Sequence, residues 1–299
     1  MKTLVFGSAN IDRTFSVPHI VAGGETIAAS KLENFSGGKG FNQAIALARA
    51  GCEVYFAGAI GKDGLFLRDN LVSDNINVDH LRISTEPSGQ AIIQVAADGQ
   101  NSIIILAGAN GTVTPALADT VLSAFSAGDL VVLQNEITSV DYILAKASEK
   151  GMLVAYNPSP FNEKAMACDL NCVDYLILNE LEGSMLSGKV APEEILSELH
   201  RKYPSTNVLL TLGSDGSLYL DKSGELSSCG IHPVKSVDTT AAGDTYTGYF
   251  LASVMAGRSV ADSMKTAAVA SGISVSRKGA SPSIPRADEV SEIEFLHIQ

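Results

Sequence analysis

A run of small residues between two aspartates is the part of this sequence best suited to chemistry. Residues 237–250 read VDTTAAGDTYTGYF, and Asp244 follows directly after Ala241, Ala242 and Gly243. The apolar residues that follow predict a helix, whose first turn has backbone N–H groups without partners and a partial positive charge. Such a turn binds anions, and small side chains let the anion approach the backbone. The stretch predicts an anion-binding turn with an aspartate placed to take a proton from the attacking group.

Glycines and a lysine precede a second predicted helix. SGGKGFNQA, residues 36–44, contains Lys39 but neither the Walker pattern nor the G-x-G-x-x-G pattern of dinucleotide-binding proteins. By itself the stretch fits a ligand-binding loop or a tight turn with a solvated lysine.

GSANID places Asn10 and Asp12 at the end of the first predicted strand, where ligands bind in open α/β sheets. Taken alone, this pair fits a turn as well as a site for hydroxyl groups.

Acidic side chains follow two more predicted strands. QNEI carries Glu136, and LNELEG at 178–183 carries Asn179 and Glu182. These carboxylates could hold Mg²⁺ through water, since Mg²⁺ needs few protein ligands, or they could cap the helices that follow. The turn TLGSDGS at 211–217 follows a further strand.

Short apolar runs alternate with helical patterns, which predicts βα units around a parallel sheet. Two segments, 11–36 and 88–108, break the alternation, and Asp98-Gly99-Gln100 in the second predicts a hairpin. They indicate a small separate sheet that covers the strand ends as a lid, or an extension of the main sheet's edge. The predicted strands are 3–8, 54–61, 130–134, 153–159, 175–179 and 208–213, and the predicted helices are 39–51, 115–128, 139–151 and 192–203. Glycines 51, 128 and 151 are predicted to end three of these helices.

Composition excludes several classes of protein. The 299 residues carry a net charge of −12, which argues against a general nucleic-acid binder. No apolar run reaches the length of about 18 residues expected of a membrane span, and the N-terminus does not read as a signal peptide. The four scattered cysteines predict reduced thiols in a cytoplasmic protein.

Taken together, the motifs resemble the carbohydrate kinases of the ribokinase type, the PfkB family. The resemblance runs nearly end to end in family order, and GGKGxNQA and DTTAAGDT are its most specific parts. Its motifs here are GSANID, GGET, SGGKGFNQA, AGAN, NPSP, LNELEG, TLGSDGS, VDTTAAGDTYTG and RKGASPSIP.

The resemblance implies a role for each matching residue. Asp244 would be the general base that deprotonates a primary sugar hydroxyl, and the N–H groups of residues 241–244 would stabilise the transferring phosphoryl group. Sugar binding would fall on Asn10, Asp12, Gly38, Lys39, Asn42 and Glu136. ATP would lie along Asn179, Thr211 and Gly213, with Mg²⁺ bound through water by Glu182. A monovalent cation, K⁺, would be bound by Asp238 and Thr240 with the loop that carries Arg277, Gly279 and Ser283.

The family shape is a three-layer α/β/α domain, here residues 1–299, with a central, mostly parallel sheet and a small β lid that often pairs two subunits in a homodimer. Phe41 and Asn135 depart from the family pattern, which leaves the identity of the sugar open. D-ribose is the first candidate. The lid segments hold few cations, which favours a neutral sugar over an acidic or phosphorylated one. Alternatives are a fructose-type sugar, a deoxy-sugar or a nucleoside, although few aromatic residues are present for a base. A non-catalytic binding protein and an oxidoreductase are the alternatives of other classes.

Overall fold

A nine-stranded sheet forms the centre of the computed structural model, which describes residues 1–296 and the side chains of residues 1–293. Its pairings are parallel except for those of the last two strands, which are antiparallel. In spatial order the strands are β13 (Leu226–Cys229), β12 (Ser217–Leu220), β11 (Asn207–Thr211), β10 (Tyr175–Asn179), β9 (Leu153–Asn157), β8 (Leu130–Gln134), β1 (Thr3–Phe6), β4 (Val54–Ile60) and β5 (Asn77–Ile83).

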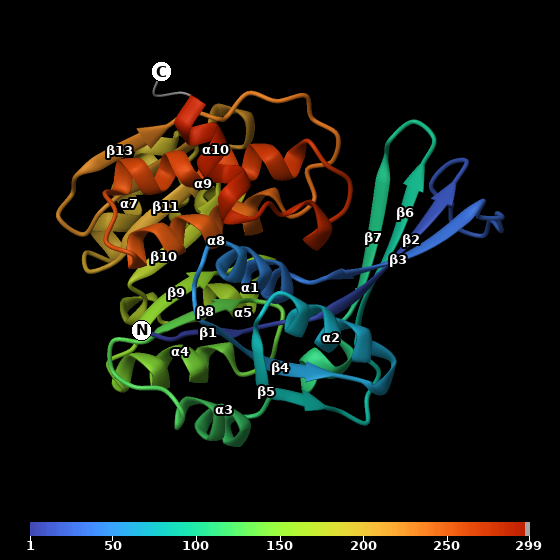
Figure 1. Cartoon of the computed structure of the whole chain (residues 1–299), viewed down its shortest axis with the longest axis horizontal. Coiled ribbons are helices and arrows are strands. Elements are labelled where there is room, and N and C mark those ends of the chain that lie inside the picture. Colours follow the sequence, from blue (N-terminus) through green and yellow to red (C-terminus); the bar gives the residue numbers. More distant parts are fainter. Residues whose placement is uncertain (297–299) are drawn as a thin grey trace.

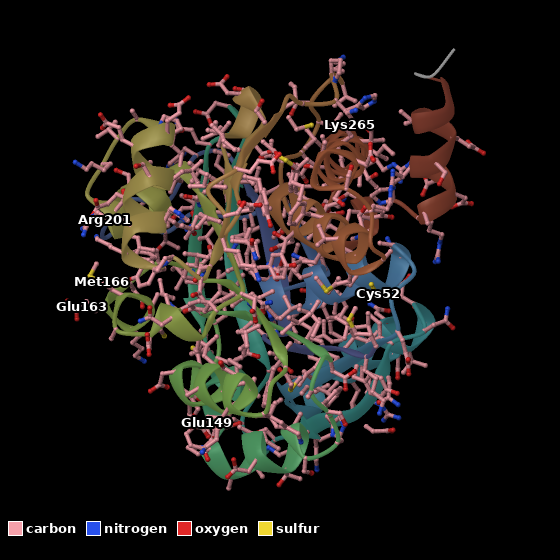
Figure 2. All side chains as sticks on the ribbon, turned by 90° about the vertical axis from the view of Figure 1, so that its left-hand side faces the viewer. Cys52, Glu149, Glu163, Met166, Arg201 and Lys265 are labelled. Atoms are coloured by element: carbon pink, nitrogen blue, oxygen red, sulfur yellow. The ribbon has the colours of Figure 1, made fainter. Side chains whose placement is uncertain are left out.

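Helices cover both faces of this sheet, so that two cores form. Along β1, Val5 packs into one core while Leu4 and Phe6 pack into the other, as the alternation of strand side chains requires. The first core is covered by α1 (Lys39–Arg49), α2 (Leu65–Ser73), α8 (Ala242–Met255), α9 (Val260–Val275) and α10 (Ala287–Leu296). The second is covered by α3 (Pro115–Leu122), α4 (Val140–Glu149), α6 (Glu180–Ser187) and α7 (Pro192–Lys202), with the short α5 (Glu163–Met166) nearby. Side chains fill the space between these layers, while charged ends such as those of Glu149 and Arg201 point outward (Figure 2).

The two segments that interrupt the alternation form a separate four-stranded sheet. Its strands are β3 (Lys31–Gly37), β2 (Asn10–Val17), β6 (Gly89–Ala96) and β7 (Asn101–Leu106) in spatial order. Figure 1 shows this sheet projecting from one side of the main body, so it is not an extension of the central sheet's edge. The expected hairpin joins β6 to β7, and Gly99 in its turn has a φ of +89°.

Most predicted elements are present, but several boundaries differ and several elements were missed. The strands predicted over 3–8, 153–159 and 208–213 each end two residues earlier than expected. The helix expected over 115–128 ends at Leu122, so Gly128 does not cap it. Gly51 and Gly151 have left-handed φ values of +99° and +76° and directly follow the last turns of α1 and α4, as expected. The strands β5, β12 and β13 and the helices α2, α9 and α10 were not predicted. Within residues 1–296, no helix has the length and apolar character needed to cross a membrane.

Candidate active site

The small residues before Asp244 form the tight entrance to α8. Ala241 is the N-cap and has a φ of +62°, a left-handed conformation that costs an alanine about 1–2 kcal/mol. Among the described residues, the backbone N–H groups of Ala241, Gly243 and Asp244 make no hydrogen bond, whereas that of Ala242 donates to Thr239 O at 3.2 Å. Three of the four N–H groups expected to face an anion are therefore available to one.

Two amide side chains hold the carboxylate of Asp244 at the start of α8. Gln43 Nε2 donates to its Oδ1 at 2.9 Å, and Asn42 Nδ2 donates to its Oδ2 at 3.1 Å. Gln43 is positioned in turn by Gln134, whose Nε2 donates to Gln43 Oε1 at 2.7 Å. Both glutamines are fully buried, and sequence reasoning missed them although they lie inside two of the motifs that it used. The carboxylate is thus fixed in orientation by groups from α1.

The predicted sugar-binding residues gather beside this carboxylate. Glu136 accepts hydrogen bonds from the Ser8 hydroxyl and from the backbone N–H of Lys39, the latter at 2.9 Å. Asn42 Oδ1 is buried and has no hydrogen-bond partner among the described residues, so it can accept from a ligand hydroxyl. Gly38 caps α1 with a φ of +92°, a conformation that favours glycine.

Charges of opposite sign are crowded together at this point. Burial by itself would lower the pKa of Lys39, but the carboxylates of Asp244, Glu136 and Glu182 outweigh it and raise that pKa. Burial raises the pKa of Glu136 despite its hydrogen bonds from Ser8 and Lys39. Burial, together with the charges of Glu136 and Asp244, raises the pKa of Asp12 to about 7. The ammonium group of Lys39 is therefore surrounded by the carboxyl groups of Asp244, Glu136 and Glu182.

We expect Asp12→Asn to change thermal stability in a way that depends on pH. The pKa of Asp12 is raised to about 7 in the folded chain, against an ordinary value of 3.8, so the folded state holds the proton more tightly. This carboxyl group therefore lowers the free energy of unfolding progressively as pH rises from about 4 to 7. The variant should melt at a higher temperature than the wild type at pH 8, and this difference should shrink at pH 5. An equal difference at both pH values in differential scanning fluorimetry would contradict the shift.

A cavity of about 190 Å³ opens beside Asn10 and Glu136. Asn110 helps to form it, because its Nδ2 donates to Asn10 Oδ1 at 2.7 Å and its Oδ1 accepts from Ala9 N at 3.1 Å. Lys164, from α5, also lines this cavity, so it has a cation that lies outside the lid segments. No spacing in the sequence pointed to Lys164.

A second cavity, of about 360 Å³, lies on the other side of the α8 entrance, and its size is typical of small-ligand sites. It contains the predicted ATP-binding residues Thr211 and Gly213, together with Gly243. Sequence reasoning missed a large part of its remaining wall, which comes from Gly230, Ile231, His232, Val234 and Ser236 and from the α9 residues Ala268, Ser271, Gly272 and Val275. All residues lining this cavity follow β10 in the chain, whereas those lining the smaller cavity precede it.

Asn179 and Glu182 form a capping box at the start of α6. Asn179 Oδ1 accepts from Glu182 N at 2.8 Å, and Glu182 Oε2 accepts from Asn179 N at 3.0 Å. The capping interpretation of these residues is therefore correct for the structure, and Asn179 does not line the larger cavity. Glu182 nevertheless lies near enough to Lys39 for its charge to act on that residue.

Asp238 joins two loops beside the α8 entrance. Its Oδ1 accepts from Thr240 N and Oγ1 at 2.9 and 2.6 Å, and its Oδ2 accepts from Gly279 N at 2.9 Å. Burial alone would raise the pKa of Asp238, but these hydrogen bonds and the charge of Lys278 lower it. The Ser283 hydroxyl donates to Ala280 O at 2.7 Å, and the Arg277 side chain pairs with Glu289 in α10. The predicted cation-site residues thus lie on two neighbouring loops, 238–240 and 277–283. Because the side chain of Arg277 is paired with Glu289, this residue could contribute only its backbone carbonyl oxygen to a cation.

The two departures from the family pattern have structural causes. Phe41 is fully buried in the core between the sheet and α1. Asn135 lies at the smaller cavity, where its Nδ2 donates to Pro160 O at 2.7 Å and to Asn162 Oδ1 at 3.0 Å.

Comparison with known proteins decides the family. The profile of the pfkB family carbohydrate kinases matches residues 2–287. The chain belongs to this family. It is an ATP-dependent carbohydrate kinase, as the sequence predicted, and the ribokinase-like fold is confirmed. A ribokinase of Haemophilus influenzae is 34% identical over 306 residues, which cover 99% of this chain and 98% of the relative.

Solved structures of the family agree with the fold. A ribokinase from Cryptococcus neoformans in complex with ADP has a TM-score of 0.86 and 36% identity, covering 98% of this chain and 99% of its own. An Arabidopsis thaliana ribokinase complexed with ribose and ATP has a TM-score of 0.85 and 30% identity, covering 98% of this chain and 97% of its own.

Proposed function

We propose that this pfkB-family enzyme transfers the γ-phosphoryl group of ATP to the primary hydroxyl of D-ribose, giving ribose 5-phosphate and ADP. The observation that carries the proposal is the position of Asp244. Asn42 and Gln43 of α1 hold its carboxylate beside the predicted sugar-binding residues, and it lies in the first turn of α8, whose residues Ala242 and Gly243 line the larger cavity. The ribokinase names of the relatives support ribose as the acceptor.

In this reaction Asp244 takes the hydroxyl proton as the sugar oxygen forms its bond to the γ-phosphorus. The bond from that phosphorus to the bridging oxygen breaks, and ADP leaves with the electron pair. The N–H groups of Ala241, Gly243 and Asp244 stabilise the charge on the transferring group, and Lys39 adds a fixed positive charge. Asn10, Asp12, Asn42 and Glu136 supply the acceptors and donors for the other hydroxyls.

Bound Mg²⁺ would neutralise charge on the phosphates, and among the described residues no cluster of three acidic, histidine or cysteine side chains could hold it without them. Glu182 is the carboxylate that we assign to it, acting through water. Because Mg²⁺ keeps most of its water ligands, one buried carboxylate is a sufficient protein contribution.

The four free cysteines agree with a cytoplasmic setting for the reaction.

The test is an assay of ADP release with ATP, Mg²⁺ and K⁺ against ribose, deoxyribose, fructose and nucleosides. We expect the highest kcat/KM on ribose. Higher turnover of another sugar would replace ribose as the substrate, and no turnover on any of them would overturn the proposal.

We expect K⁺ to activate the enzyme more than Na⁺ at equal ionic strength. Asp238 stays charged and joins the 240 turn to the 279 loop, so a cation bound there would fix the entrance to α8. A roughly tenfold difference in kcat would correspond to about 1.4 kcal/mol at the transition state. Equal rates in the two salts would remove the cation from the proposal, and Asp238→Asn should abolish any difference that is seen.

We also propose that two copies of the chain pair through the edge strand β7. Four consecutive apolar residues of this strand are each between 52% and 62% exposed, namely Ile103, Ile104, Ile105 and Leu106. An exposed apolar edge strand promotes association with another chain. Ile104→Lys should therefore turn a dimer into a monomer in analytical ultracentrifugation. The control is Val72→Lys on α2, which is similarly exposed. A monomeric wild type would contradict the proposal.

A further inference from the structure

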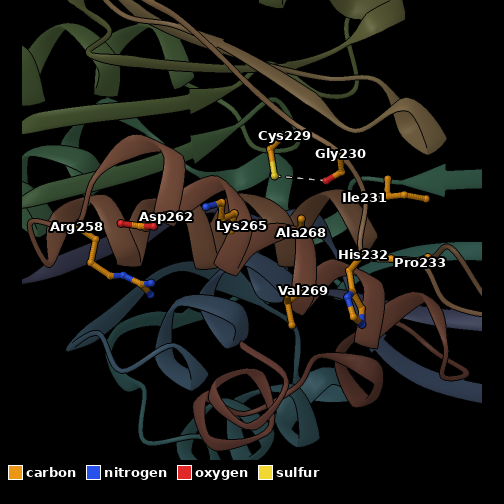
Figure 3. A pocket seen from close by; sticks show the side chains of 10 residues that line it. All are labelled: Cys229, Gly230, Ile231, His232, Pro233, Arg258, Asp262, Lys265, Ala268 and Val269. Atoms are coloured by element: carbon orange, nitrogen blue, oxygen red, sulfur yellow. Dashed lines mark hydrogen bonds between the residues drawn. The ribbon is translucent and has the colours of Figure 1, made fainter. Parts of the chain in front are cut away.

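A third cavity, of about 440 Å³, lies between α9 and residues 229–233. It adjoins the cavity of about 360 Å³ that contains Thr211 and Gly213, which we call the nucleotide cavity. Figure 3 shows Arg258 and His232 at opposite ends of it, with Asp262, Lys265 and Ala268 on α9 between them. None of the proposed catalytic steps uses this cavity.

The spacing of residues along α9 shows how the two cavities are arranged. Val275, Ser271 and Ala268 line the nucleotide cavity, and Ala268, Lys265 and Asp262 line the further one, so both lie on one stripe of three- and four-residue steps. Val275 O accepts from Val237 N at 2.9 Å, and Ser271 Oγ donates to Ala242 O at 3.0 Å. This part of α9 therefore lies beside the anion-binding turn, and Ala268 is one turn farther from it. Because the cavity extends from that turn to Ala268, a nucleotide with its phosphates at the turn would have its base near Ala268.

His232 is the bulky group at the boundary between the two cavities. Four residues line both of them, namely Gly230, Ile231, His232 and Ala268. Gly230 has no side chain, Ala268 has only a methyl group, and Ile231 is half exposed. The position of His232 is set by Gly272, because a Cβ on that glycine would lie 3.0 Å from both the Cβ and the carbonyl oxygen of His232.

We infer that His232 closes the base end of the nucleotide cavity and determines which bases the enzyme accepts. Shortening this side chain joins the two cavities and admits purine nucleotides with an apolar group on the exocyclic amine of the base. The inference rests on the proposed use of ATP.

The test compares ADP with ADP carrying a benzyl group on its exocyclic amine. Both displace a fluorescent ADP derivative from the full chain in the absence of sugar. We expect His232→Ala to bind the benzyl compound at least tenfold more tightly than the wild type does, because the ring can then pack against Ile231, Ala268 and Val269, and even one buried methylene group is worth about 10–200-fold. Affinity for ADP itself should fall. The matched control is His19→Ala, which removes an exposed histidine of the small sheet and should change neither affinity. Unchanged or weaker binding of the benzyl compound to a folded His232→Ala would overturn the inference.

A second variant works in the opposite direction and does not depend on the folding of the first. Ala268→Val adds bulk at the same boundary and should lower the affinity for the benzyl compound relative to ADP. A rise in that relative affinity would contradict the inference. Since these measurements need no sugar, they can succeed while the sugar assay fails. If the binding measurements agree with the inference but no sugar is phosphorylated, only the proposed reaction is overturned. If ribose is phosphorylated but the binding measurements disagree, only the role of His232 is overturned.

Discussion

Asp244→Asn should lower kcat by about 10²–10⁴ while leaving nucleotide affinity close to that of the wild type. The asparagine keeps the shape of the side chain but cannot accept the hydroxyl proton. It also turns an NH₂ group toward one of the two amides that now donate to the carboxylate, from Gln43 and Asn42. A small loss of thermal stability should therefore accompany the loss of rate. Single-turnover phosphoryl transfer and ADP binding are the two measurements.

Asp262→Asn is the matched control for this variant. Asp262 stands three residues after the N-cap of α9, as Asp244 does in α8, so both substitutions remove a carboxylate from the first turn of a helix. Its turnover should stay near that of the wild type. Near-normal kcat in Asp244→Asn would refute the general-base assignment.

Gly40→Ala should weaken both sugar binding and stability, against what helix propensity predicts. Inside a helix, alanine is normally favoured over glycine by about 1 kcal/mol. Here the added Cβ would lie 2.5 Å from Ser8 N and 2.6 Å from Gly7 Cα, so α1 would have to move away from the end of β1. Overpacking of this kind costs about 1–3 kcal/mol.

The same movement separates the hydrogen-bonding groups that meet at Glu136, which come from Ser8 and Lys39. We expect KM for the sugar to rise at least several-fold and the melting temperature to fall. Gly23→Ala is the control, because a Cβ there would meet nothing within 4 Å. An unchanged KM together with an unchanged melting temperature in Gly40→Ala would show that this close approach is not needed.

The sequence was sufficient for the parts of the site that lie in contiguous motifs. The helix that begins at the small residues before Asp244 and the hairpin 89–106 followed from periodicity and turn residues, because each is specified within a short stretch. Whether the hairpin belongs to a separate sheet was left open by the sequence. Gln134 was missed because a buried amide in an apolar strand has no periodic signal, and its contact with Gln43 spans 91 residues of chain.

The walls of the nucleotide cavity were harder still to predict. The segment 230–236 has neither helical nor strand structure. Its position requires a residue without a side chain at Gly272, and that glycine lies in α9, a helix that was not predicted. In the sequence, a glycine inside a helical pattern only lowers the predicted helix propensity. In the structure, Gly272 lets the backbone at His232 approach α9 closely. Such pairwise fits are decided only when the chain is folded.

The division of the two cavities at β10 has a consequence for how such an enzyme can change. The residues that line the proposed acceptor cavity precede this strand, and those that line the proposed donor cavity follow it, so under this assignment mutations that select a new sugar need not disturb nucleotide use. Asp244 is the exception, because it belongs to the later half and is oriented by Asn42 and Gln43 from the earlier one. In a chimera of two relatives joined just before β10, each half would keep its own ligand. The turnover of that chimera would then depend on whether two hydrogen bonds across the junction still align the base.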